Sequence, residues 1–277
     1  MKYMTRVAFI LVIGCWGAFL TPGCAPSAKS PIHPAISKLE HARRSVCVFH
    51  NLDTKSSGTA FMVGRTKVEM GYKYRGLTNF HVINDLTKAI ATGGIASLPD
   101  IKLTFQPTFH GEPLRVTIRL EDIDWTDPNS DWASFIFVME PYVECVELAT
   151  REEFIQLKAF EEVYLIGAGA SWIPHCRVAS MGMTHNQYHD LAIQQKPSHG
   201  PWNLHPNRFF RPDVSIWYGD SGGPIINKDG KVIGMITAFG FNNMGIVVTH
   251  AGVALKTHLI RDIVSSSKDF FKVEENK

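Results

Sequence analysis

The residues best suited to chemistry lie in the glycine-rich segment 218–224, which reads YGDSGGP. A serine hydroxyl is a weak nucleophile, so it needs a general base, an exposed position and donors for the developing oxyanion. Glycines on both sides of Ser221 permit a tight turn that exposes Oγ and aims backbone N–H groups at one point. We therefore expect Ser221 to be a nucleophile, with the N–H groups of Gly219 and Ser221 as its oxyanion hole. A glycine-rich hairpin turn is the alternative, but the whole heptad followed by an apolar run is more specific.

Two further segments supply the partners that such a serine requires. His81 stands in the segment GLTNFHVI (76–83), and Asp131 stands in DPNSDWA (127–133), just before an apolar run. Alone, His81 could be a packed side chain and Asp131 a turn residue. Together with Ser221 they would provide a general base, an acid that orients the base, and a nucleophile.

The elements that must position these residues are mostly short strands. Strand-like runs occupy residues 45–50, 59–64, 73–78, 101–106, 114–120, 132–138, 162–166, 175–180, 223–226, 232–237 and 245–255. Helices are expected at 36–44, at 150–158 behind a TREE capping box, and at 256–266. Many short strands with few helices predict an all-β sandwich or barrel rather than a parallel α/β sheet.

One long segment, residues 183–212, is typical of neither a strand nor a helix. It contains four histidines and four prolines, and a loop of this length in a compact domain is usually functional or disordered. His185 and His189 stand four residues apart, but no carboxylate lies between them as in helical zinc-protease motifs. We expect a surface insertion and no metal site.

The order His, Asp, Ser along the chain is that of chymotrypsin and not that of subtilisin or the α/β-hydrolases. The gaps are 50 and 90 residues, close to the roughly 45 and 93 of that template. With the segments SGTAF (57–61), DVSIWY (213–218) and GVAL (252–255), these motifs make the chain resemble the trypsin-like peptidases, and among them the Deg/HtrA branch. The resemblance implies two antiparallel six-stranded β-barrels, at about 45–145 and 160–256, followed by a C-terminal helix.

The same resemblance implies a serine endopeptidase that cleaves proteins or peptides through an acyl-enzyme and needs no cofactor. Its specificity pocket would have Ser215 at the base and Thr237 and Phe239 on the wall. A catalytically inactive peptidase-fold binding protein and an esterase remain as alternatives. Two features depart from the Deg branch: Asp220 stands where that branch often has Asn, and we expect no PDZ-like domain after the peptidase domain.

In trypsin, an amino terminus freed by cleavage pairs with the Asp beside the nucleophile. No Arg-Ile-Val-Gly-Gly-like junction precedes the first strand here, and residues 43–46 (RRSV) resemble one only faintly. We therefore expect no zymogen, with Asp220 either paired otherwise or left at a solvated turn.

The amino-terminal end has the form of an export signal. Lys2 and Arg6 precede an apolar run at 7–20, and Gly23-Cys24 resembles the lipidation junction of a bacterial lipoprotein. We expect a signal peptide at 1–23, a tether and short helix at 24–44, a peptidase domain at 45–267 and a tail at 268–277. The protein would then be a lipid-anchored membrane protein of the bacterial cell envelope, facing the periplasm or the exterior. Cleavage before Cys15, an ordinary secretory signal and an uncleaved anchor are the alternatives.

Charge and cysteine content exclude other classes. The net charge is +2, and both excess positive residues lie in the first 23 positions, which carry no acid. The remaining neutral body argues against nucleic acid as a partner. No cysteine pair has the C-x-x-C spacing of a metal site, and Cys47 and Cys145 are expected to be buried packing residues.

Overall fold

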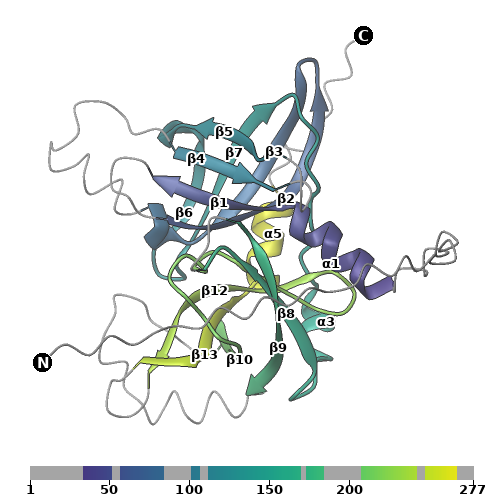
Figure 1. The fold of residues 1–277 in the computed structure, drawn as a ribbon, viewed down its shortest axis with the longest axis vertical. Helices are drawn as coiled ribbons and strands as arrows, with labels where there is room; N and C mark the ends of the chain where they lie inside the picture. Colours follow the sequence, from purple (N-terminus) through teal and green to yellow (C-terminus); the bar gives the residue numbers. More distant parts are fainter. Residues whose placement is uncertain are drawn as a thin grey trace, which may run out of the picture. The chain divides into compact units, whose positions relative to one another are not determined.

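In the computed structural model, the strands of the described residues form two antiparallel β-sheets (Figure 1). The structure describes residues 34–51, 57–83, 101–106, 112–169, 173–183, 207–241 and 247–266. The expected signal peptide, Cys15, Cys24 and the C-terminal tail lie outside these residues, as do His185 and His189.

The first sheet has seven strands in the order β5-β4-β1-β2-β3-β7-β6. They are β1 (Val46–Asn51), β2 (Ser57–Val68), β3 (Gly71–Thr78), β4 (Ile101–Phe105), β5 (Leu114–Ile118), β6 (Ile123–Asp127) and β7 (Trp132–Met139). Alternate residues of β4 are buried, as expected for a strand with one face on a core. That core is rich in aromatic side chains, including Phe49, Tyr74 and Phe135.

The second sheet is a closed barrel of six strands, in the order β10-β13-β12-β11-β8-β9. Its strands are β8 (Glu162–Gly167), β9 (His175–Met183), β10 (Phe209–Asp213), β11 (Pro224–Ile226), β12 (Val232–Phe241) and β13 (Val247–Lys256). Closure leaves no unpaired strand edge within the sheet. Aliphatic side chains such as Val163, Ile225 and Ile236 fill its interior.

The prediction of two antiparallel β-domains with a C-terminal helix is confirmed, with three differences of detail. The first sheet has one strand more than the six expected, because β6 pairs with β7 across the turn that carries Asp131. The second difference is that the expected insertion 183–212 contains strand residues at both of its ends. Strand β9 runs as far as Met183, and β10 forms at Phe209–Asp213. Pro212 concealed β10 in the sequence, since proline cannot donate to a ladder, and the register shifts between Arg211 and Pro212. The third is the middle helix, which ends at Ile155 and is shorter than predicted.

Within the described ranges, the sheets are accompanied by the helices α1 (Pro34–Arg44), α3 (Arg151–Ile155) and α5 (His258–Ser266), and residues 80–83 are also helical. A short 3-10 turn, η1 (Leu120–Asp122), precedes β6. The predicted capping box of α3 is present, since Thr150 Oγ1 accepts the N–H of Glu153 at 3.1 Å. Helix α5 reaches the first sheet, where the buried Arg75 donates from Nη1 to the carbonyl of Val264 at 2.8 Å. The helix that follows the barrel thus also fixes the first sheet.

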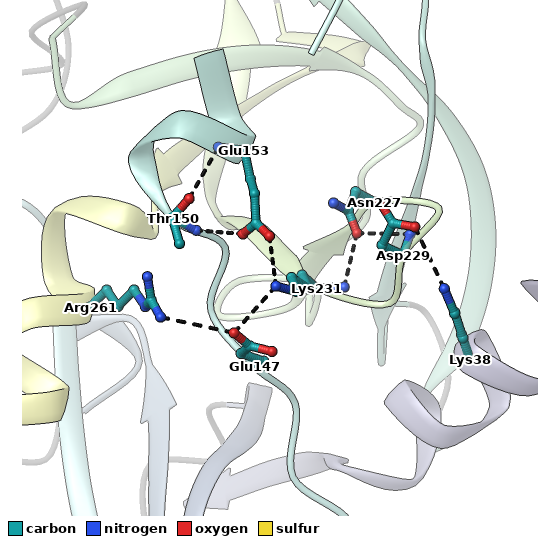
Figure 2. Close-up of polar contacts among 8 residues, drawn as sticks. All are labelled: Lys38, Glu147, Thr150, Glu153, Asn227, Asp229, Lys231 and Arg261. Carbon is teal, nitrogen blue, oxygen red and sulfur yellow. Dashed lines mark hydrogen bonds and ion pairs between the residues drawn. The ribbon is translucent and has the colours of Figure 1, made fainter. Parts of the chain in front are cut away.

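The segment between the two sheets is held to the barrel (Figure 2). Val232 donates its N–H to the carbonyl of Glu147 at 2.8 Å. Lys231 Nζ lies 2.6 Å from Glu153 Oε1 and 3.3 Å from Glu147 Oε1, and Arg261 Nη2 lies 3.9 Å from the same Glu147 oxygen. Partly exposed ion pairs of this kind stabilise little by themselves. We interpret them as fixing the path of the connection.

The buried Lys256 is expected to make stability depend on pH. Burial lowers the pKa of Lys256 to about 8, and its Nζ lies 5.6 Å from the centre of the Phe154 ring. Above pH 8 the unfolded chain still binds this proton while the folded chain does not, so the free energy of unfolding should rise from pH 8 to about pH 10. Urea unfolding at several pH values should show this rise in the wild type and a smaller one in Lys256→Met. The exposed Lys67→Met is the control, and equal slopes in the two variants would contradict the assignment.

The described cysteines are free thiols: Cys47 is buried, Cys145 is partly buried and Cys176 is exposed. Cys47 therefore packs in the core, as predicted.

Within the described part of the chain, no helix has the length and apolar character that crossing a membrane requires.

Candidate active site

His81 and Asp131 are in direct contact. His81 follows β3 by three residues, and Asp131 immediately precedes β7, the strand that pairs with β3. The Nδ1 of His81 lies 2.8 Å from Asp131 Oδ2, and the backbone N–H of His81 donates to Asp131 Oδ1 at 2.9 Å. An ionised carboxylate can only accept, so this contact places the imidazole proton on Nδ1 and leaves Nε2 as a base.

The backbone of Asp131 is strained to make this contact. Its φ is +54°, a left-handed conformation that few residues other than glycine adopt, and its side chain is fully buried. Asn79 Nδ2 donates to the carbonyl of Asp131 at 2.9 Å and so holds this conformation. Burial raises the pKa of the Asp131 carboxyl, and the hydrogen bonds from His81 oppose that rise. Strain of this kind clusters at functional sites.

The turn that carries Ser221 is bound to the first sheet next to His81. Thr59 of β2 donates its N–H to the carbonyl of Ser221 at 2.7 Å and its hydroxyl to the carbonyl of Gly219 at 2.6 Å. Thr78, three residues before His81, donates its hydroxyl to the carbonyl of Thr59 at 2.8 Å. These bonds hold the turn that carries Ser221 against β2, beside the end of β3 that leads to His81. The structure shows no hydrogen bond from Ser221 Oγ to any described residue, and such bonds often form only when substrate binds.

The same turn presents two donors together. Gly219 has φ +100°, which a residue with a side chain rarely adopts. Asp220, Gly222 and Gly223 donate their N–H groups to backbone carbonyls, whereas those of Gly219 and Ser221 have no acceptor among the described residues. An oxyanion hole requires N–H groups that no protein acceptor occupies.

Of the predicted pocket residues, Ser215 lies between β10 and β11, and Thr237 and Phe239 lie in β12. The carbonyl of Ser215 accepts a hydrogen bond from Arg177 Nη1 at 2.8 Å. Thr237 is buried, and its hydroxyl lies 3.4 Å from Nδ2 of Asn79, the residue that also bonds the Asp131 carbonyl. Phe239 pairs through its backbone with Gly252, and its side chain lies outside the described part of the structure.

Three residues at this site have structural roles that the motifs did not reveal. Thr59 and Asn79 were inside quoted segments, but nothing in the spacing indicated which groups they would bind. Arg177 lies in β9, a segment predicted only to be a strand, and it contacts Asp220 beside Ser221. Contacts between residues this far apart in the chain depend on tertiary packing.

The chain is similar to known proteins in both sequence and structure. A family profile described as a trypsin-like peptidase domain matches residues 58–235. The HtrA-type protease AlgW, solved with a tripeptide, is similar in structure with a TM-score of 0.57 and 18% identity, over 84% of this chain and 62% of that chain. Deg5 has the same TM-score and identity, over 81% of this chain and 89% of that chain. The chain thus spans less than two thirds of the AlgW chain. No curated protein matches the sequence significantly.

Proposed function

Because the chain belongs to the family of trypsin-like peptidase domains, we propose that it is a serine endopeptidase with Ser221 as nucleophile, His81 as general base and Asp131 as orienting acid. The observation that carries the proposal is the double contact of the Asp131 carboxylate with His81. A residue that only formed a turn would not need a fully buried carboxylate with one oxygen on the backbone N–H and the other on the ring of His81.

The chemistry follows from this arrangement. Ser221 Oγ attacks the carbonyl carbon of a peptide bond while His81 Nε2 takes its proton. The N–H groups of Gly219 and Ser221 stabilise the oxyanion, and Asp131 stabilises the imidazolium. His81 then protonates the leaving amine. In the second half of the reaction, His81 takes a proton from water, which attacks the acyl-enzyme, and then returns that proton to Ser221 Oγ. Protein or peptide chains are the proposed substrates.

A serine-reactive phosphonate probe tests this proposal. We expect labelling of the wild-type chain at Ser221, and neither labelling nor casein hydrolysis in Ser221→Ala. The exposed Ser57→Ala is the matched control and should behave as wild type. A folded wild-type chain that is not labelled would instead favour the inactive binding protein, and labelling with hydrolysis of esters alone would favour an esterase.

We also propose that the protein is exported and anchored by a lipid on Cys24, from the sequence of its first 24 residues. Mass spectrometry of the mature protein should find an acylated Cys24 at the amino terminus. An unmodified amino terminus at another position would contradict the anchor.

The peptidase is expected to cut after small or medium apolar residues and not after Lys or Arg. Ser215 supplies no carboxylate at the predicted pocket base, and the nearby Asp220 carboxylate is already paired with the Arg177 guanidinium that bonds the Ser215 carbonyl. Ile216 is buried, and a Cβ on Gly252 would lie 2.3 Å from its Cδ1, so apolar groups line this region. A peptide library varied at P1 measures the preference. Preferred cleavage after Lys or Arg would contradict the assignment and point to Asp213, which lines a surface hollow with Ser215.

A further inference from the structure

A buried carboxylate stands immediately before the nucleophile. Asp220 is 0% exposed, so its charge is removed from water. Its Oδ1 accepts the N–H of Gly169 at 2.8 Å, and its Oδ2 accepts the N–H of Trp217 at 2.7 Å. Arg177 Nη2 donates to the same Oδ1 and forms an ion pair with it.

Arg177 reaches Asp220 from the wall of the barrel. It lies in β9 opposite Leu165 of β8, and its side chain is 17% exposed. A Cβ on Gly167 or on Gly169 would lie 2.4 Å from Asp220 Oδ1, so the absence of side chains at both positions makes room for the pair. The guanidinium therefore bridges the Asp220 carboxylate and the carbonyl of Ser215, and holds both ends of the segment that leads to Ser221.

We infer that Arg177 is a positioning residue that holds the nucleophile turn in its reactive geometry, in place of an amino terminus freed by cleavage. The inference rests on the proposed function, because it concerns regulation of the same site. A buried carboxylate that loses its cation is strongly unfavourable. Without Arg177, the Asp220 side chain should turn toward water and carry the adjoining N–H groups of Gly219 and Ser221 out of alignment.

This assignment resolves the two alternatives that the sequence left open for Asp220. The carboxylate is paired, and its partner is an internal side chain that is present as soon as the barrel folds. The site should therefore be assembled without proteolytic processing. The contact between His81 and Asp131 belongs to the other sheet and should not depend on Arg177.

The main test compares Arg177→Met with wild type and with the control Arg119→Met, whose exposed side chain pairs with Glu121. We expect kcat/KM and the rate of phosphonate labelling to fall about 10²- to 10³-fold in Arg177→Met, as when an oxyanion donor is lost. The Arg119→Met variant should remain at the wild-type rate. Added guanidinium ion at non-denaturing concentration should restore part of the activity of Arg177→Met alone.

A second measurement does not depend on activity. In ¹⁵N NMR spectra, the amide resonances of Gly219 and Ser221 should shift in Arg177→Met, while that of His81 stays in place. If Arg177→Met does not fold, Arg177→Met combined with Asp220→Asn removes both charges, and its folding with a shifted Gly219 amide would support the inference.

If the amide resonances of Gly219 and Ser221 were unchanged in either variant, the inference would be overturned, even if the wild-type chain were inactive. Wild-type labelling rates in Arg177→Met, or a site that becomes reactive only after cleavage behind Arg44, would also overturn it. By contrast, a wild-type chain that is not labelled, together with shifted resonances in Arg177→Met, would reject the proposed peptidase activity and leave the positioning role standing.

Discussion

Replacing Asp131 with Asn is expected to lower kcat by about 10⁴-fold, with the fold retained. The backbone N–H of His81 needs an oxygen acceptor, so the amide oxygen of Asn should take the place of Oδ1. The amide NH₂ would then face Nδ1 of His81, where the carboxylate oxygen now lies at 2.8 Å. A donor at that position requires Nδ1 to be unprotonated, which puts the proton on Nε2 and removes the base.

The matched control is Asp127→Asn in the same turn. Asp127 Oδ1 accepts the N–H groups of Asn129 and Ser130, a local bond pattern that Asn also supports. Asn also tolerates the left-handed conformation at position 131, so backbone strain should not account for a loss there. Steady-state kinetics with thermal unfolding as a check on folding separates the two variants. If Asp131→Asn kept its activity while Asp127→Asn lost it, Asp127 would be the catalytic acid.

The sequence predicted the fold because the information was local. Strand β7 was predicted at 132–138 and is found at Trp132–Met139, since its apolar run and its preceding turn are read from neighbouring residues. The family resemblance, which is confirmed, likewise rested on short motifs around His81, Asp131 and Ser221. Strand β6 was missed because IDWTD is short and carries two acids, which are rare in strands. Its pairing with β7 stabilises it as a strand.

The hydrogen bonds and ion pairs that hold the site residues in place could not be predicted in this way. Arg177 and Asp220 are 43 residues apart, and Asn79 reaches an Asp131 carbonyl 52 residues away. Nothing in the residues around Arg177 distinguishes it from an exposed arginine of a strand. Its partner is determined by barrel closure, which brings β8, β9 and the turn before β11 together.

Replacing Gly222 with Ala is expected to abolish labelling of Ser221 and to destabilise the protein. A Cβ at this position would lie 2.0 Å from the carbonyl oxygen of Thr59 and 2.7 Å from Thr78 Oγ1. Neither atom can move freely, because Thr59 belongs to β2 and the Thr78 hydroxyl is bonded to the same carbonyl. The turn must therefore retreat from the first sheet, which breaks the bond from Thr59 to the carbonyl of Ser221 and separates the nucleophile from His81.

Backbone strain alone should be much less harmful, and Gly230→Ala measures it. Gly230 has φ +83°, close to the +86° of Gly222, but a Cβ there would meet only the Lys38 side chain, at 3.2 Å. A left-handed alanine costs about 1–2 kcal/mol, so Gly230→Ala should unfold at lower urea concentration and keep the wild-type rate of phosphonate labelling. Gly222→Ala should lose more stability than this and lose labelling as well. Equal effects of the two substitutions on stability, with labelling retained in both, would show that the close approach of the nucleophile turn to Thr59 is not what holds Ser221 in place.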